Sequence, residues 1–319
     1  MTPAIVTEGL ERRFGSTEAV AGVDLEVASG EIYGFRGPNG AGKSTTVRML
    51  CTLLTPSAGH ARVAGFDVVD DVHELRLHIG VALQDAALDP MQSGVELLRL
   101  QGRLYGLSHA DVERRIEELA ELVDIGPALA DRIKTYSGGM QRRLDLAAAL
   151  IHNPEVLFLD EPTTGLDPAS RARVWDEVRK LNDRGITIFL TTQYLEEADA
   201  LAGRVGIIDH GRIIAEGAPA DLKRSLGSDV IVAEVVGDTE AAQTTLAGLE
   251  AVERVERHAD ELTVVTPNAA AMLSPVAVAL ESCGVTVRSL TMRTPTLDDV
   301  FLELTGAHLV PGDAADESE

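Results

Sequence analysis

The stretch that decides the fold lies between residues 37 and 45 and reads Gly37-Pro38-Asn39-Gly40-Ala41-Gly42-Lys43-Ser44-Thr45. It fits the pattern G-x-x-x-x-G-K-[ST]. A strand predicted over Glu31 to Gly37 precedes it, and a helix predicted to begin near Lys43 follows it. A glycine-rich turn between a strand and a helix is the alternative interpretation. The Lys-Ser pair and the correct flanks favour a phosphate-binding loop.

The residue types in this loop predict how a nucleotide is held. The glycines allow the backbone to curl so that several N–H groups point at the β- and γ-phosphates, and the helix N-terminus adds a favourable dipole. Lys43 is expected to neutralise the phosphates and Ser44 to ligate Mg²⁺. The loop therefore predicts ATP and Mg²⁺ as the ligands.

A second apolar strand, Val156 to Asp160, ends in two carboxylates followed by Pro162. Asp160, at the strand end, is expected to hold the water shell of Mg²⁺, and Glu161 is expected to polarise the attacking water as general base. Alone, the Asp-Glu-Pro sequence is equally compatible with a strand that ends at a surface turn. The phosphate loop upstream favours the catalytic interpretation.

Around these motifs, residues 1 to about 220 alternate short apolar runs with longer helical patterns, which is typical of an α/β domain with a largely parallel sheet. Further strands are predicted at Thr187 to Thr191 and Val205 to Asp209. Ala110 to Val123 has the periodicity of an amphipathic surface helix. Trp175 is expected to pack a helix against the domain.

A second pattern of predicted elements begins after Gly227-Ser228, with strands and helices in the order β-α-β-β-α-β over residues 230 to 292. This order predicts a small ferredoxin-like domain, closed by a helix over residues 297 to 304. The predicted division is an ATP-binding domain over residues 1–225, an α+β domain over 226–306 and an acidic, disordered tail over 307–319.

The composition excludes several classes of protein. With 28 Lys and Arg against 51 Asp and Glu, the formal charge is -23, which would repel a nucleic-acid backbone. The two cysteines match no metal-binding spacing and suit a reducing cytoplasm. No signal peptide and no apolar run long enough to span a bilayer is found, so a membrane role is expected to be peripheral.

Three further segments resemble the conserved elements of ABC-type ATPases. The run 136–143, Tyr-Ser-Gly-Gly-Met-Gln-Arg-Arg, resembles the ABC signature, with Tyr136 in place of the usual leucine and the glutamine shifted by one place. The run 164–168, Thr-Gly-Leu-Asp-Pro, resembles the D-loop, and Gln84 resembles the Q-loop residue. The elements follow the family's order and cover residues 37 to 168.

This resemblance implies a P-loop NTPase fold of the ABC nucleotide-binding type and a homodimer that binds ATP head to tail. Ser137, Gly138 and Gly139 of one chain would contact the γ-phosphate held by Lys43 of the other, and Asp167 would join the same nucleotide site. Gln84 is implied as a further ligand of Mg²⁺. Phe14 aligns with the aromatic residue that stacks on adenine, although a phenylalanine taken alone is more often a core residue.

One position departs from the common pattern. The family usually places a switch histidine after the strand ending near Thr191, whereas this chain has Gln193, which can donate a hydrogen bond to phosphate but cannot move a proton. Gln193 and the closing segment 295–306 resemble the ATP-binding subunits of daunorubicin-resistance-type exporters. The resemblance implies that glutamine is a working catalytic-site residue here.

The implied function is ATP-driven export of a hydrophobic drug, antibiotic-like or lipid substrate through a separate permease, docked near residues 85–106 at the cytoplasmic face of the membrane. The permease is expected to make the main contacts with the substrate. A soluble ABC-type switch without a permease is the first alternative; the single set of motifs and the lack of a coiled-coil insert argue against it. A non-hydrolysing nucleotide sensor is the second, opposed by Asp160 and Glu161.

Overall fold

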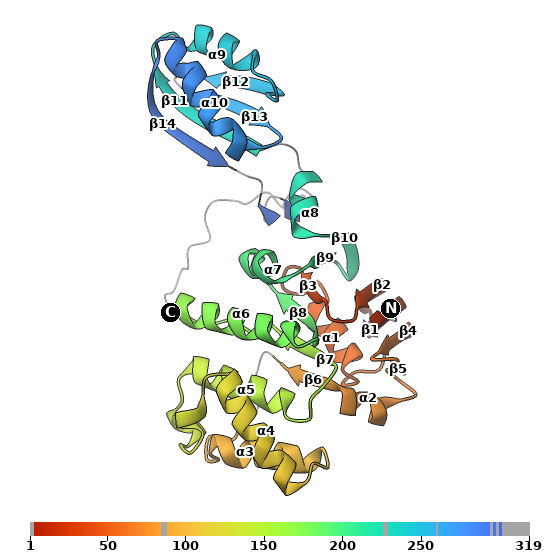
Figure 1. Ribbon diagram of the computed structural model, residues 1–319. Helices are drawn as coiled ribbons and strands as arrows, with labels where there is room; N and C mark the ends of the chain where they lie inside the picture. Colours follow the sequence, from red (N-terminus) through yellow and green to blue (C-terminus); the bar gives the residue numbers. More distant parts are fainter. Residues whose placement is uncertain are drawn as a thin grey trace, which may run out of the picture. The chain divides into compact units, whose positions relative to one another are not determined.

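The structure is a computed structural model that describes residues 3–83, 88–225, 229–259, 261–293, 296–297 and 300–301. It divides into two compact units, Met1–Pro219 and Ala220–Glu319 (Figure 1). The division falls after the first residue of helix α8 (Pro219–Ser225), whereas the boundary expected from sequence, between residues 225 and 226, follows that helix.

A six-stranded sheet forms the centre of the first unit, in the order β10-β9-β3-β8-β7-β6. Strands β6, β7, β8, β3 and β9 are parallel, and only β10 pairs antiparallel, with β9. The predicted parallel sheet is therefore confirmed. The strands are β3 (Ile32–Arg36), β6 (Ile79–Ala82), β7 (Val156–Asp160), β8 (Thr187–Thr192), β9 (Arg204–Asp209) and β10 (Arg212–Gly217).

An antiparallel sheet of four strands lies beside it, in the order β2-β1-β4-β5. Its strands were not predicted from the sequence. Strand β2 alternates buried and exposed residues along part of its length, as expected when one face of a sheet packs on the core. Its strands are β1 (Pro3–Phe14), β2 (Thr17–Ala28), β4 (Ala58–Val63) and β5 (Phe66–Asp67).

Three helices of the first unit form a separate group. The group of α3, α4 and α5 packs together beyond the edge strand β6, as Figure 1 shows. Helix α4 buries Val112, Ile116, Leu119 and Leu122, which confirms the predicted amphipathic helix. The helices are α1 (Lys43–Leu50), α2 (Val72–His78), α3 (Gly94–Leu104), α4 (His109–Leu122), α5 (Gly138–Leu150), α6 (Pro168–Asp183) and α7 (Leu195–Leu201), with single turns at Gly126–Ala128 and Ile133–Thr135.

The second unit is an antiparallel sheet in the order β12-β13-β11-β14, with α9 and α10 packed against it. This strand order is that of a β-α-β-β-α-β ferredoxin-like domain, as predicted. Its elements are β11 (Asp229–Val236), α9 (Thr239–Ala247), β12 (Arg254–His258), β13 (Glu261–Thr266), α10 (Ala269–Ser282) and β14 (Thr286–Arg293). The predicted helix over 297–304 and the predicted tail lie largely outside the described residues.

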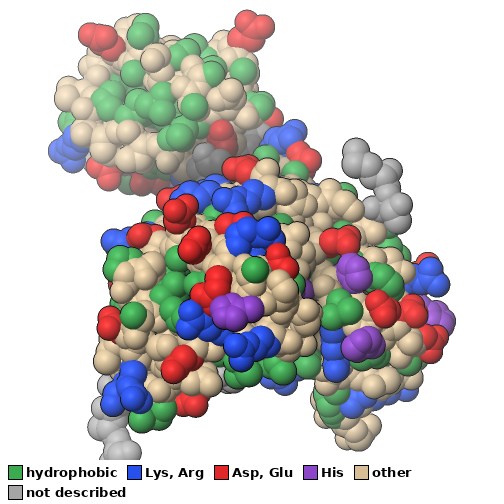
Figure 2. Space-filling view, turned by 60° about the horizontal axis from the view of Figure 1, so that its bottom comes forward, with side chains coloured by type: hydrophobic (Ala, Val, Ile, Leu, Met, Phe, Trp, Pro, Cys, Tyr) green, Lys and Arg blue, Asp and Glu red, His purple; other side chains and the backbone are tan. Residues whose placement is uncertain are grey.

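The surface carries charges of both signs despite the acidic total. On the face shown in Figure 2, Lys and Arg side chains of the first unit are interspersed with Asp and Glu side chains. Among the described residues on this face, the basic side chains form no continuous positive surface.

Aromatic packing holds the central strands together, and Phe189 of β8 lies at its middle. Its ring centroid is 5.6 Å from that of Tyr33, 5.4 Å from that of Phe35 and 5.7 Å from that of Phe158. All four side chains are fully buried. The rings therefore join β3, β7 and β8, the strands whose ends carry the motifs.

Replacing Phe189 by alanine is expected to lower the free energy of unfolding of the first unit by about 3 to 5 kcal/mol, because it leaves a cavity between three strands. Urea unfolding followed by the fluorescence of Trp175, the single tryptophan of the chain, measures this unit. Leu104→Ala, at a side chain that is 72% exposed, is the control and should change stability little. Equal effects of the two substitutions would contradict the central role of Phe189.

Candidate active site

The loop between β3 and α1 is shaped by close contact with the neighbouring strand β9. A Cβ atom built on Gly37 would lie 2.3 Å from the carbonyl oxygen of Ile208, so no larger residue fits there without a shift. Gly42 has φ of +108° and directly precedes α1, which begins at Lys43. The two glycines let the chain turn sharply from the end of the strand into the start of the helix.

Lys43 is buried beneath this loop, with 5% of its surface exposed. Its Nζ donates hydrogen bonds to the carbonyl oxygens of Gly37, at 2.7 Å, and Pro38, at 3.2 Å. The Nζ atom is also 3.7 Å from Oε1 of Glu161. Burial lowers the pKa of Lys43 below its usual value, and the nearby Glu161 carboxylate opposes that shift. The lysine therefore joins the two predicted motifs directly.

Asp160 ends β7 next to the first turn of α1. Ser44 Oγ donates to Asp160 Oδ1 at 3.3 Å, and the hydroxyl of Thr191 donates to the same oxygen at 2.5 Å. Hydroxyl and carboxylate oxygens are the hard donors that Mg²⁺ prefers. The donor set at Ser44 and Asp160 thus fits the cation that the sequence predicts.

Glu161 follows in a left-handed backbone conformation, with φ of +49°. Its N–H donates to both the carbonyl and the hydroxyl oxygen of Thr191, each at 3.1 Å. Thr164 Oγ1 donates to Glu161 Oε2 at 3.2 Å. Gln193 lies on a turn in which Tyr194 N donates to Thr192 Oγ1 at 2.9 Å. Both residues sit at the carboxyl ends of adjacent parallel strands.

These groups line one cavity of about 340 Å³. Its walls come from the phosphate loop, from β2, from the end of β7 and from the turn after β8; the lining residues are Ala19, Pro38, Asn39, Gly40, Gly42, Lys43, Ser44, Thr45, Glu161 and Gln193. Binding at the carboxyl ends of parallel strands is general for such sheets. The arrangement can hold a polyphosphate beside a carboxylate and an amide.

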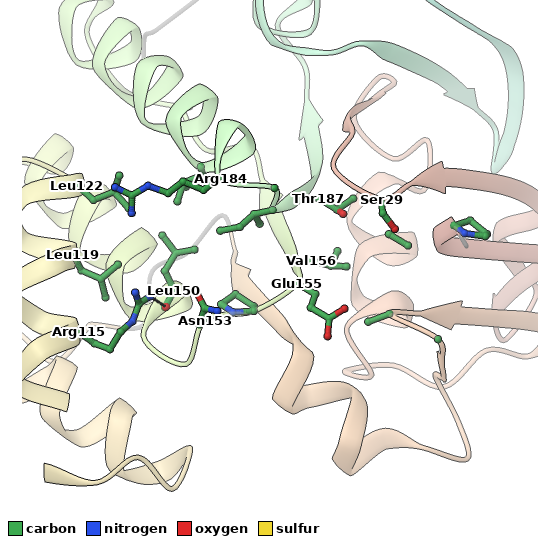
Figure 3. A pocket seen from close by; sticks show the side chains of 18 residues that line it. Ser29, Arg115, Leu119, Leu122, Leu150, Asn153, Glu155, Val156, Arg184 and Thr187 are labelled. Atoms are coloured by element: carbon green, nitrogen blue, oxygen red, sulfur yellow. Dashed lines mark hydrogen bonds between the residues drawn. The ribbon is translucent and has the colours of Figure 1, made fainter. Parts of the chain in front are cut away.

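A larger cavity, of about 430 Å³, lies at the opposite ends of the same strands. Figure 3 shows Val156 and Thr187, the first residues of β7 and β8, at its wall, with Arg115 on the side of the helices. Arg115 donates to the carbonyl oxygen of Leu150 at 2.8 Å and to Glu118 at 2.6 Å, so these contacts engage its guanidinium within the fold. We therefore place the candidate active site at the phosphate loop.

The signature residues lie together with the D-loop and do not line the nucleotide cavity. Ser137 caps α5 by accepting a hydrogen bond from Met140 N at 3.3 Å. Asp167 caps α6 by accepting from the N–H groups of Ala169 and Ser170, each at 3.0 Å. A Cβ built on Gly139 would lie 3.2 Å from Ser170 Oγ, which shows how near the two helix starts are.

The predicted adenine-stacking residue, Phe14, is not among the residues that line the cavity. Phe14, at the end of β1, is 47% exposed and is therefore not a core residue. The guanidinium of Arg12 lies over its ring at 4.6 Å from the centroid. Gln84 lies outside the described residues.

Two side chains have structural roles that were not predicted from the sequence. Thr191, in β8, pairs with Asp160, in β7. Both strands were predicted, and adjacent parallel strands bring their carboxyl ends together, so the predicted strands could have indicated this pair. Arg142, in the signature helix, donates to the carbonyl oxygens of Leu83, Asp160 and Pro162. Arg142 thus ties α5 to the strand that carries the predicted catalytic carboxylates.

Comparison with known proteins identifies the architecture. Residues 20–164 match the family described as ABC transporter, and residues 217–305 match the C-terminal domain of DrrA1-3-like ATP-binding proteins. The chain is 48% identical to the daunorubicin resistance ATP-binding protein DrrA3 of Streptomyces coeruleorubidus, over 95% of this chain and 96% of that protein. The chain belongs to the ABC transporter family.

A further relative of this ABC subunit and a solved structure agree with that assignment. The daunorubicin/doxorubicin resistance ATP-binding protein DrrA of Streptomyces peucetius is 47% identical over 96% of this chain and 93% of its own length. A solved ATP-binding subunit of an ABC transporter superposes with a TM-score of 0.64 at 27% identity, covering 70% of this chain and 93% of that one. The chain is accordingly the ATP-hydrolysing subunit of an exporter, which works with a membrane component.

The described part of this ABC subunit contains no helix with both the length and the apolarity needed to cross a bilayer.

Gly37→Ala is expected to weaken ATP binding by this ABC subunit roughly tenfold or more, because the added methyl group must displace the loop from Ile208. Titration with a fluorescent ATP analogue measures the affinity. Gly126→Ala is the matched control, since its Cβ would meet only ordinary contacts at 3.7 Å and beyond. An affinity unchanged in Gly37→Ala would show that the loop tolerates the displacement.

Proposed function

We propose that this chain binds ATP with Mg²⁺ and couples its hydrolysis to the export of hydrophobic, drug-like molecules through a separate membrane permease. The observation that carries the proposal is the convergence of Lys43, Glu161 and Gln193 on one cavity at the carboxyl ends of the central strands. The cavity combines a phosphate loop with a carboxylate, as ATP hydrolysis requires.

Each residue in the cavity has a proposed role. The loop N–H groups and Lys43 bind the β- and γ-phosphates, and Gln193 donates a hydrogen bond to the γ-phosphate. Glu161 accepts a proton from the attacking water. Ser44, Asp160 and Gln84 hold Mg²⁺, which when bound neutralises charge that develops on the phosphates. The exposed ring of Phe14 stacks on adenine, in keeping with its place at the end of β1.

The separation of the signature from the phosphate loop supports a dimer as the active form. Ser137, Gly138 and Gly139 begin α5, and Asp167 begins α6, so both sets are at helix N-termini that attract anions. In a two-fold dimer, these residues of one copy would face the phosphates bound by the other copy. ATP would then hold the two copies together, and hydrolysis would release them.

The substrate is proposed from the relatives, and the docking region from exposed hydrophobic side chains in α3 and just before it. Two relatives are daunorubicin resistance proteins, which supports a hydrophobic antibiotic-like cargo. Met91, Leu100 and Leu104 are exposed large hydrophobic side chains within the segment expected to dock. A permease that buries them would hold the chain at the cytoplasmic face of the membrane.

Glu161→Gln is expected to reduce ATP hydrolysis by roughly 100-fold or more while preserving ATP-dependent dimerisation, because the amide cannot accept the proton. Hydrolysis of MgATP by the purified chain and light scattering in ATP measure the two properties. Glu117→Gln, at an exposed position of α4, should match the parent chain. A chain that binds ATP but neither hydrolyses it nor dimerises, even with a co-expressed permease, would favour the nucleotide sensor instead.

Gln193→His is expected to leave ATPase activity within about an order of magnitude, because imidazole can also donate a hydrogen bond to phosphate. Steady-state hydrolysis at saturating MgATP checks it. Complete loss of activity would show that the glutamine has a role that histidine cannot fill.

A further inference from the structure

Helix α6 and the segment that follows Gln193 are joined by a row of side-chain contacts. On α6, the contacting residues are Arg171, Trp175 and Arg179, which are spaced by four and therefore lie on one face of the helix. Their partners are Tyr194, Glu197 and Ala200, which are spaced by three along α7 and its start. Figure 1 shows α7 running beside α6. We call these six residues the α6–α7 row.

The middle contact of the row is buried. Trp175 Nε1 donates a hydrogen bond to Glu197 Oε1 at 2.9 Å, and Glu197 is fully buried. Burial raises the pKa of Glu197, and the nearby side chains of Thr192, Trp175 and Thr163 oppose the rise. Thr192 directly precedes Gln193 and Thr163 follows Glu161 by two residues. The carboxylate therefore lies near both segments that carry the proposed catalytic side chains.

Of the two flanking contacts, one lies beside Gln193 and Asp167, and the other lies at the far end of the row. The guanidinium of Arg171 lies 4.7 Å from the centroid of the Tyr194 ring and 3.9 Å from Glu196 Oε2. Arg179 donates to the carbonyl oxygen of Ala200 at 3.2 Å. Tyr194 is the neighbour of Gln193, and Arg171 lies about one turn beyond Asp167, the residue that caps α6.

We propose that Trp175 and Glu197 are positioning residues that fix Gln193 relative to Asp167, so that phosphate contact at Gln193 sets the position of the dimer-facing end of α6. The proposal rests on the proposed function, because it assigns Gln193 to phosphate and Asp167 to the partner copy. The physical basis is that a buried carboxylate with a tryptophan N–H donor has few alternative partners. A movement of α7 is therefore passed to α6 along the row.

Trp175 makes the test direct, because it is the single tryptophan of the chain and lies within the row. In the full-length chain, addition of MgATP is expected to change the fluorescence of Trp175. Gln193→Ala should abolish that change while ATP still binds, as followed with a fluorescent ATP analogue. An intact fluorescence response in Gln193→Ala would overturn the proposal.

The catalytic consequence is measured in Trp175→Phe, Glu197→Ala and the double variant. Each single variant is expected to lower kcat roughly tenfold with KM for ATP changed by less than about twofold, and the double variant should be no worse than either. Glu197→Gln keeps an acceptor for the indole N–H and should restore most of the activity. Arg173→Ala, at an exposed position on another face of α6, should leave kcat unchanged.

A merely structural role predicts a different pattern. Loss of packing alone would lower the unfolding midpoint in proportion to the loss of activity, and the two single effects would add. Additive losses, or an equal loss of ATP binding, would overturn the coupling. If the parent chain binds ATP with a Gln193-dependent fluorescence change but does not hydrolyse it, the proposed function fails and the coupling stands.

Discussion

The contact of Gly37 with the backbone of Ile208 is the constraint from which the rest of the site follows. A chain with a formal charge of -23 must bind a polyanion through local donors, since its overall field is unfavourable. The tight approach directs the chain from β3 into α1, and Lys43 is thereby folded under the loop within reach of Glu161. The aromatic packing around Phe189 then holds β3, β7 and β8 in the order that brings their ends together.

Local patterns made the nucleotide cavity predictable from sequence. The phosphate loop and the strand ending at Asp160 are each encoded in a short stretch of sequence, and the alternation of strand and helix patterns predicts the parallel sheet. Each is found where expected. Thr191 was not predicted as a partner of Asp160, because its role depends on the register between two strands 31 residues apart. In the antiparallel sheet of β1, β2, β4 and β5, the pairing of β1 with β4 was likewise not predicted, because it joins segments that lie far apart in the sequence.

The two groups of functional residues lie on separate parts of the first unit. Lys43, Glu161 and Gln193 share the nucleotide cavity, whereas Ser137 and Asp167 mark the starts of α5 and α6. Two sets of contacts link the groups. Arg142 connects α5 to the end of β7, and the α6–α7 row connects α6 to the segment after β8. A site divided in this way is sensitive to small rotations of helices, which suits a protein that uses ATP to change conformation.

Glu161 occupies a backbone conformation that a non-glycine residue enters at a cost of about 1 to 3 kcal/mol. Hydrogen bonds to Thr191 maintain it, whereas glycine would adopt it without strain. Selection for catalysis and selection for a stable fold thus favour different residues at this position. In a descendant that no longer hydrolyses ATP, glycine at position 161 would relieve this backbone strain, but it would leave the buried Lys43 without its neighbouring carboxylate.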